Sequence, residues 1–285
     1  MHIARFSDGD DTRLGLKVAD GLVDLTARLE GAPRDTVDLM SLWPDLALDL
    51  AALAAFPADH ALTGVQLLAP VRRPHKILGI GMNYADHARE MGLELPTSQF
   101  WFSKQSSALN DPFGDVEMPV GSIELDYEAE LVCVIGRHVR NADATGAREA
   151  IFGYCVGNDV SVRDRQTETS QVMLGKCGDT HAPVGPWITT ADAIDVADIA
   201  IRTWVNGDLR QNSRTREIIY DCVRMIEHLS RVMTLEPGDL LFTGSPYGVG
   251  KGFSPPRWLQ PGDRVRVEIE GLGAIENKIV PAPIP

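Results

Sequence analysis

The sequence is poor in cysteine and in positive charge, and both shortages exclude classes of protein. Its 285 residues include four cysteines, none of which form a Cys-x-x-Cys pair. A disulfide framework or a zinc site is therefore not expected, and a reducing compartment fits the composition. The 27 Lys and Arg residues are outnumbered by 40 Asp and Glu residues, which gives a net charge of −13. Such acidity argues against a nucleic-acid partner and against an anionic membrane surface.

Long hydrophobic runs are also missing. No apolar stretch approaches the length of a membrane span, and the N-terminal segment shows no charged-then-apolar signal pattern. We therefore expect a cytoplasmic protein without a membrane partner. The hydrophobic fraction of 44% is ordinary for a globular protein with a sizeable core. The length of 285 residues fits one large domain, or a large domain with a small companion.

A boundary between two domains is predicted near the prolines at 70 and 74. Residues 1–70 are expected to form a small N-terminal β/α cap domain, and residues 71–285 the larger domain. Helical spacing of apolar residues covers 39–56, where Pro44 is expected to split the helix. Strands in the small domain are predicted at residues 2–7, 14–18 and 22–25.

Two acidic residues lead into an apolar strand in the larger domain. The β-branched run Leu131–Ile135 predicts a buried strand. Glu128 and Glu130 precede it with a spacing of two, so their side chains share one face. Carboxylates that enter an apolar environment side by side need neutralisation, and a cation is the usual means. This pair is therefore a candidate metal-binding site.

A third carboxylate, Asp159, follows a second short apolar segment at 154–160. Three carboxylates on adjacent strands would form an oxygen-rich site suited to Mg²⁺ or Mn²⁺. The residues alone leave an alternative open, in which the acids lie on a solvated edge and pair with Arg163 or Arg137.

A histidine and a glutamate share one face of a predicted helix. The helix is expected from 83 to 91, with Asn83 as its N-cap and Gly92 just beyond its end. His87 and Glu90 are three residues apart within it. A carboxylate beside an imidazole orients the ring and raises its basicity, which suits a general base. The alternative is an ordinary surface salt bridge.

Two lysines border the same region. Lys104 ends an aromatic strand at 100–104 and either extends toward solvent or faces an anion. Lys176 lies in a short loop between Gly175 and Gly178, where it could approach a ligand closely or simply be exposed.

The remaining pattern is mainly structural. Helices are predicted at 141–153 and 218–233, and Asn206-Gly207 predicts a hairpin turn. The loop 243–250 lacks the ending of a P-loop, but its amides could hold a carboxylate. The apolar stripe of the second helix consists of Ile219, Val223, Ile226, Leu229 and Val232 with Met233.

Together these segments resemble the fumarylacetoacetate hydrolase family over about residues 75–280. The resemblance depends on five blocks in the family's order. They are Asn83-Tyr84-Ala85-Asp86-His87 with Glu90, Asp126 to Leu131, Asn158 to Ser161 with Arg163 and Gln166, Gly175-Lys176, and Thr243 to Gly250.

The resemblance implies an α+β, β-rich fold, in which a mixed β-roll catalytic domain stands behind the small N-terminal domain, and a homodimer. It implies that Glu128, Glu130 and Asp159 bind Mg²⁺ or Mn²⁺. It also implies that His87 and Glu90 act on a mobile lid helix and that Lys176 is catalytic.

The implied activity is hydrolysis of a carbon–carbon bond in an acylpyruvate or 2,4-dioxo acid, a small anionic 2-oxo acid. The metal would stabilise an enolate, and water activated by His87 would attack the distal carbonyl. Lys176 and Gln166 would hold the oxygens that gain charge. The residues expected to bind substrate are Lys104, Arg163, Gln166, Thr243, Gly244 and Ser245.

Two other functions fit the same residues. Oxaloacetate decarboxylation or keto–enol isomerisation (tautomerisation) of a 2-oxo dicarboxylate would use the same metal without attack by water, and a non-catalytic binding or scaffold protein is a further alternative. The chain also departs from relatives that cleave acylpyruvates. Met82, Gln105, Cys177, Gly178 and His181 replace residues common in that group, which leaves the substrate open.

Overall fold

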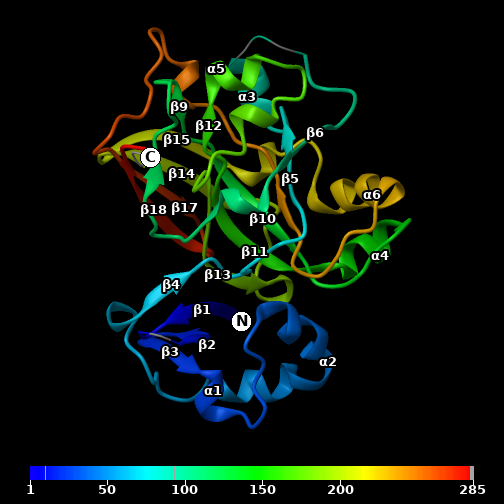
Figure 1. Ribbon diagram of the computed structural model, residues 1–285. Helices are drawn as coiled ribbons and strands as arrows, with labels where there is room; N and C mark the ends of the chain where they lie inside the picture. The colour runs from blue at the N-terminus through cyan, green and yellow to red at the C-terminus, as the bar shows by residue number, and fades with distance from the viewer. Residues whose placement is uncertain (10, 91, 93, 283–285) are drawn as a thin grey trace.

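A β-rich architecture of mixed sheets is observed in the computed structural model, which describes residues 1–9, 11–90, 92 and 94–282 (Figure 1). The largest sheet has the strand order β3-β2-β1-β13-β11-β10-β16-β5-β6, with β4 beside β1 and β7 beside β13. Most neighbouring strands are antiparallel, but β16 and β5 run parallel. The expected β-rich α+β fold is confirmed.

The strands of this sheet and its neighbours have the following bounds. The large sheet contains β1 (His2–Ser7), β2 (Thr12–Val18), β3 (Gly21–Asp24), β4 (Gln66–Leu68), β5 (Ile77–Gly81), β6 (Phe100–Lys104), β7 (Leu109–Asn110), β10 (Ala129–Ile135), β11 (Ile151–Asn158), β13 (Ala182–Thr190) and β16 (Leu240–Phe242). A second sheet has the order β15 (Asp208–Arg214), β14 (Ala200–Val205), β17 (Arg264–Ile269), β18 (Gly273–Val280) and β8 (Val116–Glu117). A short pair joins β9 (Leu125–Asp126) to β12 (Ser161–Val162).

Strand β10 separates two hydrophobic cores. All seven of its residues are buried, because apolar side chains occupy both of its faces. Leu131, Cys133 and Ile135 pack into one core, together with residues of the second sheet and α6 (Cys222–Val232). Val132 and Val134 pack into the other core, with residues of α2 (Thr36–Leu53) and the N-terminal strands. A strand covered on both sides has a fixed register, because a slip of one residue would exchange its faces.

The N-terminal strands form hydrogen bonds with the larger unit. Strand β1 pairs with β13 through His2 and Ile3, and the blue N-terminal elements lie together at one end of the molecule (Figure 1). The unit also contains α1 (Leu25–Arg28) and α2 (Thr36–Leu53). The boundary near residue 70 stays a prediction, since the sheet itself continues across it.

Three helix predictions need correction. Helix α2 runs through Pro44, which lies exposed within it, so the predicted split at this residue is wrong. Helix α4 covers only Ala144–Glu149, since residues from Ile151 onward join β11. Helix α6 begins at Cys222, where the Asp221 side chain caps it, and ends at Val232.

The later start of α6 changes its buried stripe. Met225, Ile226 and Leu229 are buried, whereas Val232 is 69% exposed and was wrongly placed in the core. The predicted hairpin at Asn206-Gly207 is confirmed, because both residues have positive φ and connect β14 to β15.

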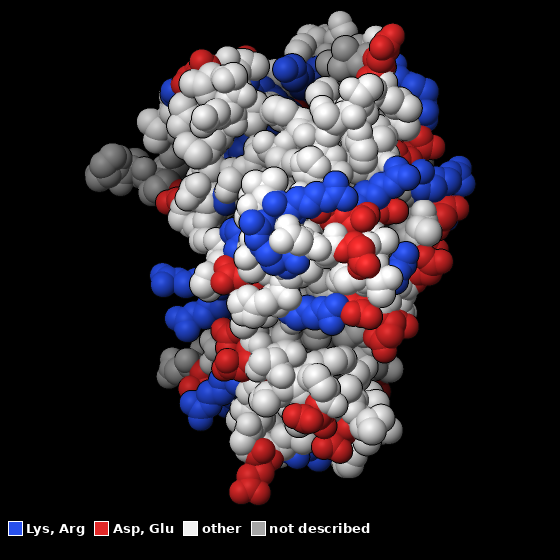
Figure 2. All heavy atoms as spheres, turned by 90° about the vertical axis from the view of Figure 1, so that its right-hand side faces the viewer, with Lys and Arg blue, Asp and Glu red and all other residues white. Residues whose placement is uncertain are grey.

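Charges of both signs are mixed on the face that carries α4 and α6. Lysine and arginine side chains gather in a band across this face, with acidic side chains beside them (Figure 2). Within the described residues, no helix combines the length and the apolar character needed to cross a membrane.

The two-core arrangement predicts a large cost for truncating a central strand. Leu241 of β16 is fully buried beside β10. We expect Leu241→Ala to lower the free energy of unfolding by about 2–5 kcal/mol, because it leaves a cavity. Leu48→Ala is the control: Leu48 is 86% exposed on α2, so the change should stay within about 0.5 kcal/mol. Urea denaturation measures both, and equal effects would contradict this packing.

Candidate metal centre and its cavity

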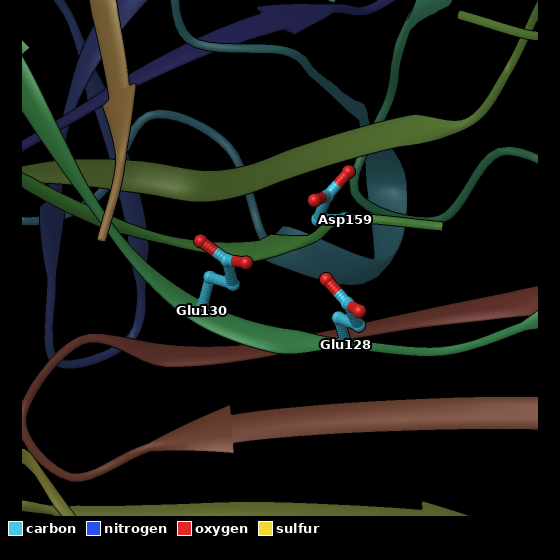
Figure 3. Close-up of side chains that lie close together, drawn as sticks. All are labelled: Glu128, Glu130 and Asp159. Carbon is cyan, nitrogen blue, oxygen red and sulfur yellow. The ribbon is translucent and has the colours of Figure 1, made fainter. Parts of the chain in front are cut away.

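The three predicted carboxylates converge at the adjoining ends of two strands. Glu128 directly precedes β10, Glu130 lies within it, and Asp159 directly follows β11. Strands β10 and β11 are antiparallel with Ala129 opposite Asn158, which brings Glu128 beside Asp159. One carboxylate oxygen from each acid lies within 4.8 Å of the others (Figure 3).

Burial and mutual repulsion act strongly on these acids. Burial, with the charges of Asp159 and Glu128, raises the pKa of Glu130 well above its ordinary value. Glu128 behaves differently. Burial would raise its pKa, but the charges of Lys176 and Arg163 outweigh burial and lower the pKa to about 2. The cluster therefore has one acid, Glu130, that lacks enough positive charge nearby.

Lys176 lies among the metal-ligand candidates. Its ammonium donates hydrogen bonds to Glu128 at 2.8 Å, to Asp159 at 2.6 Å and to the Ser161 hydroxyl at 2.7 Å. An ammonium has three donors, so protein atoms use all of them in this arrangement. The geometry favours a role in neutralising and positioning the carboxylates. Binding a substrate oxygen would require Lys176 to release one of these partners.

Lys104 is also directed at the carboxylates. Its side chain is fully buried, and its ammonium donates to Asp159 at 2.6 Å. Burial lowers the pKa of Lys104, and the adjacent Asp159 charge opposes this effect. Lys104 is not among the residues that line the cavity beside Glu128 and Glu130. The structure therefore places its ammonium on Asp159, where a contact with substrate was expected.

Arg163 joins the cluster to a fourth carboxylate that we had not assigned. Its guanidinium contacts Asp126 and Glu128 at 2.8 and 2.7 Å. Asp126 is fully buried and also accepts hydrogen bonds from the amides of Gly250 and Lys251. A signal for this role was present in the sequence. Asp126 continues the spacing of two that relates Glu128 to Glu130.

The donor set fits a divalent cation. The cluster contains four carboxylates, those of Asp126, Glu128, Glu130 and Asp159, and three cationic side chains, those of Lys104, Arg163 and Lys176. Its formal charges therefore sum to one excess negative charge. The raised pKa of Glu130 agrees with this excess. Hard carboxylate oxygens are the ligands that Mg²⁺ and Mn²⁺ prefer. Glu128, Glu130 and Asp159 could therefore hold such an ion.

The His–Glu pair is formed as predicted. On helix α3 (Ala85–Glu90), His87 Nδ1 lies 3.0 Å from the Glu90 carboxylate, and His87 lines the cavity. The amide of Gly248 donates to the other oxygen of Glu90 at 3.2 Å. The predicted extension of this helix to Met91 lies outside the described residues.

Asn83 was wrongly predicted as the cap of α3. Its side chain instead donates to the carbonyls of Tyr220 and Thr243 and accepts from the Tyr220 amide. These bonds connect the segment before α3 to two parts of the chain that are remote in sequence. Distant partners of this kind leave no local pattern.

The glycine-rich loop 243–250 already uses several of its amides. Gly244 donates to Glu130 at 2.7 Å, Gly248 to Glu90, and Gly250 to Asp126 at 2.6 Å. The expected binding of a substrate carboxylate by these amides is therefore not supported, because they position the protein's own carboxylates. Thr243 has a buried hydroxyl without a hydrogen-bond partner among the described residues, and Ser245 lines the cavity.

A cavity of about 320 Å³ opens beside Glu128 and Glu130, a size that suits a small metabolite. Gln166 faces it in a defined orientation, because Arg163 donates to its Oε1 at 3.0 Å. Its Nε2 has no hydrogen-bond partner among the residues that the structure describes, so it can donate to a ligand. The other lining residues include Ile80, Met82, His87, Phe100, Phe102, Arg163, Val172, Lys176, Ser245, Val249 and Lys251.

Two lining residues have unusual backbone conformations. Met82 and Val172 have φ of +55° and +53°, in the left-handed region that non-glycine residues rarely adopt. Backbone strain of this kind clusters at functional sites. Of the two, only Met82 had been noted from the sequence, as a departure at the pocket.

Comparison with known proteins defines the family. Residues 76–280 match the family model of the fumarylacetoacetate (FAA) hydrolase C-terminal domain. The chain is 39% identical to the mitochondrial oxaloacetate tautomerase fahd2 of Xenopus laevis, over 98% of this chain and 90% of that protein. The chain therefore belongs to the fumarylacetoacetate hydrolase family, and it is a metal-dependent enzyme of that family.

Two solved structures extend the comparison. A maleylpyruvate hydrolase from Sphingobium, in complex with manganese(II) and pyruvate, has a TM-score of 0.83 and 35% identity, covering 99% of this chain and 100% of that one. A 5-carboxymethyl-2-hydroxymuconate delta-isomerase from Mycobacterium smegmatis has a TM-score of 0.80 and 34% identity, covering 100% of both chains. These relatives carry different activities. The homodimer and the cytoplasmic location stay predictions.

The raised pKa of Glu130 predicts how metal affinity depends on pH. Because its pKa is higher in the folded chain than the ordinary 4.5, the metal-free protein should lose stability as pH rises from that value through the raised pKa. Metal binding requires the deprotonated acid, so affinity should rise over the same window. Calorimetry with Mn²⁺ between about pH 5 and 8 measures this. Glu130→Gln should bind weakly with a flatter profile, and a pH-independent affinity of the unmodified chain would contradict the assignment.

The Gly244 amide predicts a sensitive position next to the metal centre. Gly244 has φ of +92°, and an added Cβ would lie 2.9 Å from Cβ of Asn83. We expect Gly244→Ala to shift the amide that holds Glu130 and to weaken Mn²⁺ binding by about tenfold. Gly146→Ala on α4, where the nearest atom would lie at 3.4 Å, is the control. Calorimetry that finds both variants unchanged would exclude the role of this amide.

Proposed function

We propose that this protein hydrolyses a carbon–carbon bond in an acylpyruvate or 2,4-dioxo acid, with Mg²⁺ or Mn²⁺ as cofactor. One observation supports this most directly: His87, which Glu90 orients, borders the same cavity as the carboxylates Glu128 and Glu130. When bound, the cation supplies a Lewis acid for the carboxylate and 2-oxo oxygens of the substrate. The manganese and pyruvate in the Sphingobium relative support this substrate class.

His87 acts as the general base. Glu90 accepts a hydrogen bond from Nδ1 of the ring and stabilises the charge that forms there. The Nε2 atom can then take a proton from water, which attacks the distal carbonyl of the substrate. The bond between that carbonyl carbon and C3 then breaks, which releases the distal carboxylic acid and the enolate of pyruvate. His87 returns the proton to C3, which gives pyruvate. Gly248 keeps the Glu90 carboxylate in place through its amide.

Gln166 and Arg163 serve the oxygen that gains negative charge. Arg163 fixes the orientation of the Gln166 amide, so Nε2 of Gln166 donates toward the cavity without having to reorient. Donors that are oriented before the reaction stabilise developing charge at little cost. Lys176 and Lys104 hold Glu128 and Asp159 in place for the cation.

A second candidate is tautomerisation of oxaloacetate. It is favoured by the 39% identity over nearly the whole chain to an enzyme named for that activity. The same base could move a proton at the carbon beside the 2-oxo group without adding water. The two functions thus share the metal centre and the base, and they differ in whether water attacks the substrate and a carbon–carbon bond breaks.

Product analysis distinguishes the candidates. We expect acetylpyruvate or a larger 2,4-dioxo acid to give pyruvate and a second carboxylic acid with Mg²⁺, and no product with a chelator. Conversion of enol to keto oxaloacetate, followed by ultraviolet absorbance, without cleavage of any dioxo acid, would replace hydrolysis by tautomerisation. If both activities persist in the presence of the chelator, the proposed metal dependence is contradicted.

The dyad predicts a separation between turnover and metal binding. Glu90→Gln should lower kcat at least about tenfold, because the imidazolium loses its partner. The Mn²⁺ affinity should stay nearly unchanged, since Glu90 lies on α3 and is not one of the three carboxylates that could hold the cation. Glu149→Gln, on the exposed surface of α4, is the matched control for both measurements. Equal losses in turnover and in Mn²⁺ affinity would show that the roles are not separate.

A further inference from the structure

One lysine at the cavity differs from the other cations there. Arg163, Lys176 and Lys251 are the lysine and arginine residues among those that line the cavity. Arg163 is paired with Asp126 and Glu128, and Lys176 with Glu128 and Asp159. The ammonium of Lys251 has neither an ion pair nor a hydrogen bond with any residue that the structure describes. Lys251 is thus the cation that remains free for a ligand.

The backbone of Lys251 is fixed firmly to the metal centre. Its amide donates to Asp126 at 3.0 Å, and the preceding Gly250 amide donates to the same carboxylate at 2.6 Å. The residue after Lys251, Gly252, lies close to Glu90, because a Cβ added to this glycine would lie 3.0 Å from the Glu90 carboxylate. The exposed lysine side chain therefore starts from a constrained turn between Asp126 and the His–Glu pair.

The charges define what this lysine can recognise. The buried cluster carries one excess negative charge, so a divalent cation would leave one positive charge, and the carboxylate of a 2-oxo acid would neutralise it. A second carboxylate on the substrate would then need a cation of its own. Much of the cavity wall is apolar, with Ile80, Met82, Phe100, Phe102, Val172 and Val249. Lys251 is the free positive side chain that such a group can reach.

We propose that Lys251 binds the distal carboxylate of a dianionic 2-oxo acid and so determines the preference for 2-oxo dicarboxylates. This inference rests on the proposed function, because it assumes that the 2-oxo acid end lies at the metal centre. It deepens that function by naming the substrate class. An uncharged acyl group would contact the apolar wall alone and would gain nothing from Lys251.

Binding of matched ligands tests this without turnover. 2-Oxoglutarate and 2-oxopentanoate have the same number of carbons, but the first ends in a carboxylate and the second in a methyl group. 2-Oxoadipate and 2-oxohexanoate form a longer pair. Calorimetry in the presence of Mn²⁺ gives the ratio of the two affinities in each pair. We expect the unmodified chain to prefer the dicarboxylate in at least one pair, and the preference to fall as salt is added.

The variants remove or keep the charge at one position. Lys251→Met should reduce the dicarboxylate preference about tenfold, as expected for the loss of a charged hydrogen bond. Lys251→Arg should retain most of the preference. Lys278→Met removes the charge of an exposed lysine on β18, which does not line the cavity, and should leave the ratio as it is.

Each other outcome overturns the inference. Three results would exclude a role for Lys251 in recognising the distal carboxylate. The unmodified chain could bind both members of each pair equally, Lys251→Met could weaken both members equally, or Lys278→Met could have the same effect as Lys251→Met. If the Mn²⁺-loaded chain binds no 2-oxo acid at all, the proposed function fails and the inference fails with it. Binding without discrimination overturns the inference alone.

Discussion

The buried ion cluster at the ends of β10 and β11 is the interaction on which the rest of the structure depends. Four carboxylates and three cations meet there in an apolar setting, where an unpaired charge is costly. Lys176 alone joins Glu128, Asp159 and Ser161 through all three of its donors. The paired charges hold one another in place, while Glu130 remains short of positive charge. That imbalance is what makes the cluster a site for a divalent cation.

The surrounding fold explains why this cluster keeps its geometry. Strand β10 is covered on both faces, so its register places Glu128 and Glu130 without freedom to slip. The loop 243–250 then supplies amides to Glu130, Glu90 and Asp126. One loop thereby connects the metal centre, the His–Glu pair and the turn that carries Lys251.

Local sequence patterns predicted the parts of this site that depend on short spacing. The spacing of two in Glu128 and Glu130 and the spacing of three in His87 and Glu90 both correspond to shared faces in the structure. Contacts between remote segments could not be predicted in this way. Asn83 looked like a helix cap but connects Tyr220 to Thr243, and the partners of Lys104 and Lys176 depend on how distant strands meet. The fold class followed from the family resemblance, whereas the local signal of Pro44 wrongly predicted a break in α2, which continues through this residue.

The central claim is that Glu128, Glu130 and Asp159 hold the catalytic cation beside the His–Glu pair. Anomalous diffraction from crystals grown with Mn²⁺ and pyruvate tests it most directly. We predict one strong peak roughly 2.0–2.2 Å from an oxygen of each of these three carboxylates, with pyruvate next to it in the cavity. A peak at another set of residues, or pyruvate bound away from the carboxylates, would contradict the account.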